Sequence, residues 1–292
     1  MIIFSYKFFF QLINKIPFSV AFFCSKYIGL FLYYIKAAPA KITVTNLRLA
    51  FPHFSKKEIS KLAISSLQET LKCSFENFKI WNGSSVFLNS LAIEVEGLEF
   101  LENSLKIQNG LILFTPHQGN IEILIYYLAK NYNCTIPYTM AKNQLLQNMM
   151  LQSRNSIGAK MVSTDMSGVR SLIKTLKNNT VVAMAPDQVP DNKKGVIAKF
   201  FNKDALTITL LSNLAIKTKS PCHSMCCIRK KENGSYKIIF SKRLADMNED
   251  ITTSVNTMNN ALEKCIMIAP DQYAWEYKRY KHSSNKDYYE SL

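Results

Sequence analysis

The sequence predicts an α/β fold, with one domain built on a mixed, largely parallel central sheet flanked by helices and preceded by a hydrophobic N-terminal helix. From about residue 93 onward, short apolar runs alternate with longer amphipathic runs, which is typical of strands and helices that alternate along a chain. The 292 residues are 48% hydrophobic, enough for one sizeable core. No linker interrupts the alternating region, so a single domain is expected there.

The individual elements follow from the spacing of the apolar residues. Strands are predicted at residues 93–95, 111–114, 135–139, 160–163, 181–185, 223–228 and 236–240. Helices are predicted at residues 55–81, 99–108, 120–131, 143–156, 167–177, 205–217 and 251–268. Ser55 is placed to cap the first of these helices. In such sheets, functional groups gather in the loops that follow the carboxyl ends of the strands.

The first 36 residues are predicted to form a membrane anchor, and residues 37–292 the folded domain. No Asp or Glu occurs among the first 57 residues, and twelve aromatic residues lie between Phe4 and Tyr34. Basic residues are interspersed with them: Lys7, Lys15, Lys26, Lys36, Lys41, Arg48, Lys56 and Lys57. This composition is typical of a segment at the boundary between hydrocarbon and anionic headgroups.

Residues 16–35 form an apolar run of about the length that spans a bilayer. Lys26 at its centre would cost roughly 2.5–3.5 kcal/mol at mid-bilayer, a cost that a tilted or interfacial helix avoids. A cleaved signal peptide is the alternative, but residues 37–40 make a poor cleavage site. An uncleaved anchor is therefore expected, with spanning and interfacial placements both open.

The net charge of +15 and a pI near 9.4 indicate an acidic partner. Nucleic acid, an anionic membrane and an acidic carrier protein all meet that requirement. Nucleic acid is disfavoured because the chain carries no RNA-binding signature and much of its positive charge lies on the apolar N-terminal segment.

The seven cysteines have no disulfide-framework spacing, which favours reduced thiols. Cys222, Cys226 and Cys227 flank His223 in a way that resembles a metal site. However, the segment has the pattern of a buried strand, where alternate side chains point to opposite faces, and no second ligand pair occurs at a recognised spacing. No metal and no cofactor are expected.

The candidate catalytic group follows the predicted strand at residues 111–114. Of the four histidines, His117 is the one that directly follows a predicted strand and has an acid, Glu122, five residues on. On one continuous helix the two would lie about 140° apart. If Gly119 provides a turn and Asn120 caps the helix, Glu122 can hold one imidazole nitrogen while the other acts as a general base. A loop histidine beside a first-turn Glu favoured by the helix dipole is the open alternative.

No serine or cysteine adjoins this pair in sequence, so the attacking hydroxyl is expected to belong to the substrate. Arg154 is a second candidate, able to bind a phosphate or stabilise an oxyanion if it faces the same cleft, although a solvated helix end is the more common case. Asp187 and Gln188 follow another predicted strand and are candidate ligands for polar substrate groups, although Asp in a turn is often only turn chemistry.

The C-terminal stretch at residues 272–279 is aromatic and basic, and a packed Trp275 with its basic neighbours reaching solvent is expected there. Several known motifs are absent from the sequence: a GxGxxG after a strand, a P-loop, HExxH and GxSxG.

These stretches, in this order, resemble the late (secondary) lipid A acyltransferases, the lauroyl/myristoyl group within the lysophospholipid acyltransferase superfamily. His117-Gln-Gly-Asn-Ile-Glu122 resembles the H-x4-D/E motif in the form that ends in Glu. The other matching stretches are residues 46–52, Arg154 with 158–159, 186–188 with 200–201 and 205–207, and 272–275 with Arg279. H-x4-E alone is a weak signal, whereas the ordered series is specific.

The resemblance implies transfer of an acyl chain from an acyl carrier protein thioester to a hydroxyl of a phosphorylated glycolipid, a lipid A precursor. It also implies a place at the cytoplasmic face of the bacterial inner membrane. Within it, His117 and Glu122 are expected to be catalytic, and Arg154, Asp187 and Gln188 to bind substrate.

Two departures bear on which acyl chain or acceptor is used. Ile121 stands where the family usually has an aromatic residue, and Asn202 where it usually has a glycine. Another acceptor, such as a lysophospholipid or a different glycolipid, and a non-catalytic membrane-binding relative are the alternatives that the sequence leaves open.

Overall fold

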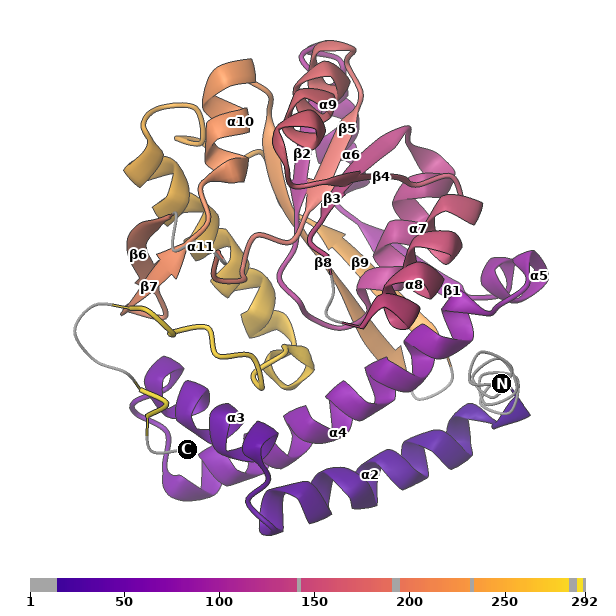
Figure 1. Ribbon diagram of the computed structural model, residues 1–292, viewed down its shortest axis with the longest axis vertical. Helices are drawn as coiled ribbons and strands as arrows, with labels where there is room; N and C mark the ends of the chain where they lie inside the picture. Colours follow the sequence, from indigo (N-terminus) through magenta and orange to yellow (C-terminus); the bar gives the residue numbers. More distant parts are fainter. Residues whose placement is uncertain (1–14, 141–142, 191–194, 232–233, 284–287, 291–292) are drawn as a thin grey trace.

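The computed structural model describes residues 15–140, 143–190, 195–231, 234–283 and 288–290 (Figure 1). Its helices are α2 (Phe18–Tyr34), α3 (Ala38–Ala50), α4 (Lys56–Trp81), α5 (Ser85–Asn89), α6 (Leu98–Leu105), α7 (Ile121–Asn131), α8 (Gln144–Ser156), α9 (Met166–Lys177), α10 (Leu210–Thr218) and α11 (Ile251–Ile268), with the 3-10 turn η1 (Pro270–Gln272). Its strands are β1 (Ala92–Glu96), β2 (Leu111–Phe114), β3 (Cys134–Tyr138), β4 (Lys160–Ser163), β5 (Val181–Met184), β6 (Val196–Phe200), β7 (Lys203–Thr207), β8 (Cys222–Lys231) and β9 (Ser235–Phe240).

The central sheet confirms the predicted α/β class. Its seven strands follow the order β1-β9-β8-β2-β5-β3-β4. Every neighbouring pair is parallel except β8 and β9, which form an antiparallel hairpin. The largely parallel sheet therefore brings the ends of β2, β5 and β3, which are far apart in the sequence, to the same edge.

Two apolar cores lie on the two faces of the sheet. All four residues of β2 are buried, and they alternate between the cores: Leu111 and Leu113 pack with α6 and α7, whereas Ile112 and Phe114 pack with α9, α10 and α11. A strand buried on both faces is expected to be continuously apolar, as this one is.

Helix α4 crosses the end of the sheet and contributes to both cores, through Ile59 and Ala63 at one end and Ile80 at the other. Figure 1 shows α4 beneath the sheet, with α2 running alongside it. The predicted cap is confirmed: the Ser55 side chain accepts from the Glu58 backbone, and the Glu58 carboxylate accepts from the Ser55 backbone at 2.7 Å. This reciprocal capping box fixes where α4 begins.

The predicted helix over residues 205–217 is wrong in its first part. Residues 205–207 belong to β7, which pairs with β6 in an antiparallel hairpin, and α10 begins only at Leu210. The hairpin turns at Phe201 and Asn202, which both have a positive φ, 47° and 59°. Two left-handed residues favour a tight hairpin, but they are usually Asn or Gly, so the Phe here concealed the turn.

The predicted membrane anchor is described from residue 15 onward, and residues 1–14 lie outside the described part of the chain. Within the part described, no single helix has the length and apolar character needed to cross a membrane. Helices α2 and α3 meet those criteria only as a pair, and they are bent by 79° at the break between them.

The C-terminal stretch packs against the N-terminal helices. Trp275 is 1% exposed, which confirms its predicted packing, but Arg279 is only 2% exposed and does not reach solvent. Its guanidinium donates to Leu206 O and Thr207 Oγ1, each at 2.8 Å. Asn46 of α3 donates to Trp275 O at 2.7 Å and thereby joins the first and last matching stretches of the sequence.

Candidate active site

The His117 loop leaves β2 and turns into α7 at the edge of the sheet. The His117 carbonyl accepts from Ala274 N at 3.0 Å, and Gly119 N donates to Gln272 O at 2.8 Å. The Asn120 side chain then caps α7 by accepting from Ile123 N at 3.1 Å, as the sequence predicted. These bonds hold the histidine in an ordered loop between a strand and a helix.

Asp187 is the carboxylate that binds His117. Its Oδ1 lies 2.5 Å from His117 Nδ1, and its Oδ2 accepts from His117 N at 2.9 Å. The parallel register of β2 and β5 pairs Phe114 with Met184. His117 and Asp187 each follow three residues after these paired positions. The sheet therefore aligns the two residues before either side chain makes a contact.

The partners of the imidazole indicate its tautomer. The ionised carboxylate of Asp187 only accepts, so Nδ1 carries the proton, and Nε2 keeps its lone pair. The Gln188 amide nitrogen lies 3.3 Å from that Nε2 and can donate to it. This arrangement leaves the Nε2 lone pair facing the cavity, which is what a general base requires.

Glu122 does not contact His117 as the sequence spacing predicted, and that expected pairing is wrong. Its carboxylate instead forms a bidentate pair with Arg154 of α8, through Nη2 at 2.7 Å and Nε at 3.1 Å. Glu122 lies in the first turn of α7, and its side chain points toward Arg154 of α8. The His117 ring points instead toward Asp187, which follows β5. A requirement for Glu122 in catalysis remains a prediction.

All five predicted site residues meet around one cavity of about 460 Å³. His117, Glu122, Arg154 and Gln188 line it, and Asp187 supports His117 from below the surface, at 2% exposure. One wall is apolar and is formed by α7 and the ends of β3, β5 and β8: Ile121, Leu124, Ile125, Leu128, Ile136, Ala183 and Met225. An apolar wall with a few converging polar groups is the usual composition of a small-molecule site.

Asp187 governs the pKa of His117. Burial alone would lower that pKa, but the negative charge and the hydrogen bond of Asp187 outweigh burial and raise it above the ordinary value. Burial likewise works to raise the pKa of Asp187, yet His117 and then Arg279 lower it overall. The imidazole is therefore a stronger base than a free histidine.

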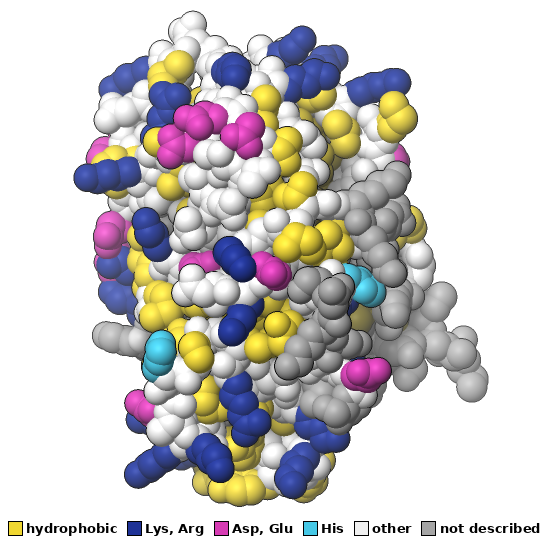
Figure 2. Space-filling view, turned by 90° about the vertical axis from the view of Figure 1, so that its left-hand side faces the viewer, with side chains coloured by type: hydrophobic (Ala, Val, Ile, Leu, Met, Phe, Trp, Pro, Cys, Tyr) yellow, Lys and Arg dark blue, Asp and Glu magenta, His cyan; other side chains and the backbone are white. Residues whose placement is uncertain are grey.

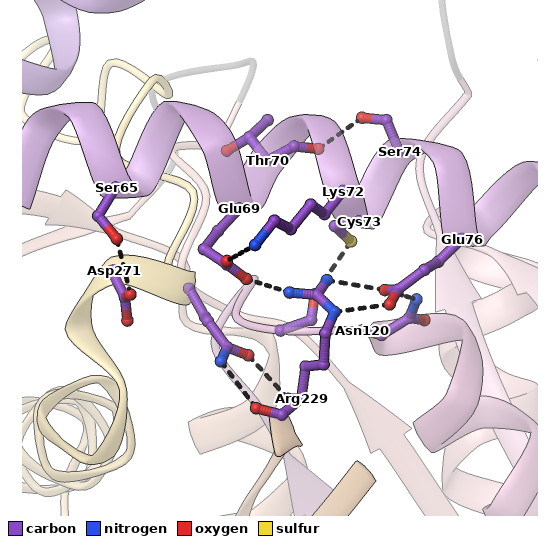
Figure 3. Close-up of polar contacts among 12 residues, drawn as sticks. Ser65, Glu69, Thr70, Lys72, Cys73, Ser74, Glu76, Asn120, Arg229 and Asp271 are labelled. Atoms are coloured by element: carbon purple, nitrogen blue, oxygen red, sulfur yellow. Dashed lines mark hydrogen bonds and ion pairs between the residues drawn. The ribbon is translucent and has the colours of Figure 1, made fainter. Parts of the chain in front are cut away.

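A buried network of charges ties α4 to the His117 loop, as Figure 3 shows. Arg229 of β8 donates to both carboxylate oxygens of Glu76, at 2.6 and 2.8 Å, and also pairs with Glu69. Glu76 in turn accepts from the Asn120 side chain at 3.0 Å. The Gln272 amide binds the Arg229 backbone at both N and O, at 2.8 and 3.1 Å. Lys72 also pairs with Glu69 at 3.0 Å, so two cations face the two carboxylates of the network.

Sequence reasoning missed two groups at this site. It assigned Asp187 to the substrate rather than to His117, and it did not single out Glu276, which lines the cavity and accepts from Thr70 at 3.2 Å. Burial raises the pKa of Glu276. The turn after a predicted strand did signal Asp187, but local spacing carries no information about which strands are neighbours.

The cysteines around His223 lie in a buried strand, β8, as the sequence predicted. Cys222, Cys226 and Cys227 are buried, and all seven cysteines are free. Among the residues that the structure describes, no group of three or more His, Cys, Asp or Glu side chains could hold a metal ion.

Comparison with known proteins places the chain in a family. The model of the bacterial lipid A biosynthesis acyltransferase family matches residues 1–282. The lipid A biosynthesis lauroyltransferase of Escherichia coli K12 is 25% identical over 248 residues, 83% of this chain and 79% of the relative. The palmitoleoyltransferase of the same strain is 23% identical over 271 residues, 91% and 87% of the two chains. A lipid A biosynthesis acyltransferase of Haemophilus influenzae is 23% identical over 232 residues, 79% and 72%.

An α/β sheet with a histidine base beside an apolar cavity fits the class of enzymes that transfer an acyl group. The chain belongs to the bacterial lipid A biosynthesis acyltransferase family, as the resemblance in the sequence implied. It is therefore an O-acyltransferase that acts in lipid A biosynthesis.

Gly119 provides a test of the loop geometry. Its φ is +57°, and an added Cβ would lie 1.8 Å from Cys227 O. Replacing Gly119 by Ala should lower the free energy of unfolding by more than 2 kcal/mol, since left-handed backbone alone costs about 1–2 kcal/mol and the clash adds to it. Thermal unfolding measures this loss.

Gly158→Ala is the matched control, because Gly158 also has a positive φ, +89°, but no atom lies within 4 Å of its added Cβ. It should show the backbone cost alone. Equal losses in the two variants would mean that the close approach of the His117 loop to β8 is not as described.

Proposed function

We propose that this chain transfers a fatty acyl group from an acyl carrier protein thioester to a hydroxyl of a lipid A precursor. The observation that carries the proposal is the His117–Asp187 pair beside a cavity with an apolar wall. The names of the relatives, a lauroyltransferase and a palmitoleoyltransferase, support a fatty acyl donor.

The acceptor hydroxyl binds at His117 Nε2 and takes the place of the Gln188 amide. Nε2 removes its proton as the oxygen attacks the thioester carbon, so a C–O bond forms and the carbonyl becomes an oxyanion. When the tetrahedral intermediate collapses, the C–S bond breaks, and the imidazolium returns the proton to the departing thiolate. The products are an ester and a free carrier thiol, and Asp187 stabilises the imidazolium between the two steps.

Gln188 and Arg154 are proposed to bind the reacting groups. The Gln188 amide, released from Nε2, can donate to the substrate oxygen. Arg154 uses Nε and Nη2 for Glu122, and its Nη1 is outside that pair. We assign Nη1 to the oxyanion or to a phosphate of the acceptor. Glu122 then acts as a positioning residue that fixes the direction of the guanidinium.

Direct attack of the acceptor hydroxyl on the thioester fits the raised pKa of the thiol that lines the cavity. Cys73 lines the cavity and donates to Gly119 O at 3.0 Å. Burial and then the charge of Glu76 raise its pKa well above that of an ordinary thiol. A nucleophilic cysteine needs the opposite shift, so a cysteine-bound acyl intermediate is not part of this proposal.

The charge of the protein suits these partners. A net charge of +15 attracts an acidic carrier protein, a phosphorylated glycolipid and an anionic membrane. Figure 2 shows Lys and Arg side chains spread over the face that carries α10, α11 and the β6–β7 hairpin. We infer that the protein works at the bacterial inner membrane, with its catalytic domain facing the cytoplasm.

The reaction can be tested with purified protein and a panel of substrates. Acyl groups on carrier protein and on coenzyme A are offered with either a lipid A precursor or a lysophospholipid as acceptor. We expect ester formation only with the lipid A precursor and faster transfer from the carrier protein. Replacing His117 by Ala should lower turnover by about 10²–10⁴-fold. Preference for the lysophospholipid, or a fully active His117→Ala protein, would contradict the proposal.

The pH dependence tests which carboxylate acts on His117. The base must be neutral, so kcat/KM should rise with pH through a pKa above the ordinary histidine value, because Asp187 raises it. In Asp187→Asn, burial is no longer offset, so this rise should move to lower pH while the maximum falls by about 10²–10⁴-fold.

Glu122→Gln is the matched variant, and its rise should stay at the wild-type pH because Glu122 contacts Arg154 instead of His117. Should the rise move in Glu122→Gln and stay in Asp187→Asn, the pairing predicted from the H-x4-E spacing would be the correct one.

A further inference from the structure

Glu276 lines the cavity and, unlike its two fellow glutamates there, has no cation beside it. Glu69 and Glu122 also line the cavity, and each of them pairs with an arginine. Glu276 forms no ion pair with any residue that the structure describes, and its one contact from another side chain is the bond that Thr70 donates to Oε2 at 3.2 Å. The remaining capacity of this carboxylate to accept hydrogen bonds is therefore open to a ligand.

The C-terminal stretch brings Glu276 close to His117. Ala274 N donates to His117 O at 3.0 Å, and Glu276 follows Ala274 by two residues. The two groups are near enough for their charges to interact: burial raises the pKa of Glu276, and the charge of protonated His117 works against that rise. Because both side chains line the same cavity, a substrate held at His117 can also contact Glu276.

The cavity is polar on the side that α4 and the C-terminal stretch form. Thr70, Ser74 and Asn77 line it, and their spacing of four and three residues places them on one face of α4. Figure 3 shows Thr70 and Ser74 on consecutive turns of this helix, where Ser74 Oγ donates to Thr70 O at 2.8 Å. The Asn77 amide oxygen accepts from Cys73 at 3.9 Å, whereas its amide nitrogen donates to no described residue. Both partners of a hydrogen bond, an acceptor on Glu276 and a donor on Asn77, are thus available.

The two sides of the cavity suit different parts of the substrates. The apolar wall that α7 helps to form suits an alkyl chain. Hydroxyl and amide N–H groups of a sugar headgroup need acceptors when they leave water, and a carboxylate accepts more strongly than a neutral oxygen. Phosphate oxygens accept rather than donate, so they suit Arg154 better than Glu276.

We propose that Glu276 binds the sugar headgroup of the acceptor by accepting from a hydroxyl or an amide N–H, while Asn77 donates to an oxygen of the same headgroup. Glu276 is then a specificity-determining residue, because an acceptor without such a donor leaves a desolvated carboxylate without a partner. Thr70 holds the carboxylate in place. This inference rests on the proposed function, since it takes the acceptor to be a glycolipid.

The chain contains a matched contact that separates sugar binding from a purely structural role. Ser65 Oγ donates to Asp271 Oδ2 at 2.9 Å, as Figure 3 shows. This pair also joins a hydroxyl of α4 to a carboxylate of the C-terminal stretch, and its members precede Thr70 and Glu276 by five residues each. Asp271 does not line the cavity. Asp271→Ala therefore removes an equivalent link without touching the proposed sugar site.

Steady-state kinetics with a lipid A precursor and an acyl carrier protein thioester test the assignment. Glu276→Ala should raise the KM of the acceptor by about tenfold or more and leave the KM of the donor unchanged. Glu276→Gln should restore most of the lost affinity, because its amide oxygen still accepts. Asp271→Ala should behave like the wild type. Equal effects of Glu276→Ala and Asp271→Ala, or an acceptor KM that Glu276→Ala leaves unchanged, would overturn the assignment.

Direct binding keeps this inference apart from the proposed reaction. Calorimetry measures the affinity for the lipid A precursor in detergent micelles, in a His117→Ala background that suppresses turnover. Adding Glu276→Ala should weaken binding by about tenfold, and adding Asp271→Ala should not. Unchanged binding in the first double variant would overturn the sugar site even where the wild type transfers acyl chains. Weakened binding beside a wild type that transfers none would support the sugar site and contradict the reaction.

Asn77→Ala tests the same site while leaving the bond between Thr70 and Glu276 intact. It should weaken binding of the lipid A precursor by about two- to tenfold, as expected for one neutral hydrogen bond, with unchanged thermal unfolding. This variant also provides a result if Glu276→Ala lowers the stability of the fold. Wild-type affinity in Asn77→Ala would remove Asn77 from the site and overturn the proposed pairing with the headgroup.

Discussion

The contact between Asp187 and His117 is the constraint on which the rest of the site depends. One carboxylate holds both the ring and the backbone of the histidine, at 2.5 and 2.9 Å, so it fixes the position and the tautomer together. It exists because β2 and β5 are parallel neighbours in register. Gln188, next in the chain, reaches Nε2 for the same reason. The pairing of strands in the sheet therefore positions His117, and the helices around it complete the cavity.

The charged side chains beside the cavity form ion pairs with one another. Glu122 pairs with the partly buried Arg154, and Glu76 and Glu69 pair with the buried Arg229, so these ion pairs hold α8 and β8 in place around the cavity. Arg229 also touches Phe22 of α2 on one side and, through Glu76, Asn120 on the other. A continuous set of contacts thus connects the exposed N-terminal helix with the loop that carries His117.

Much of the fold was accessible from the sequence, because the alternation of apolar runs directly reflects burial. The strands at 111–114 and 160–163 and the helix at 251–268 have the predicted bounds, and the Ser55 cap is confirmed. The β6–β7 hairpin was missed because Phe201 adopts a positive φ without Gly or Asn. His117 was located by its place after a strand. Its partner was not, because H-x4-E spacing describes neighbours along the chain, whereas Asp187 is a neighbour across the sheet.

The central claim is that Asp187, and not Glu122, holds the His117 ring. The most direct measurement is NMR of protein labelled with ¹⁵N at histidine, since only four histidines contribute signals. The account predicts a strongly downfield Nδ1 proton on His117 in the wild type and in Glu122→Gln, and its loss in Asp187→Asn. A signal that survives in Asp187→Asn and disappears in Glu122→Gln would contradict it.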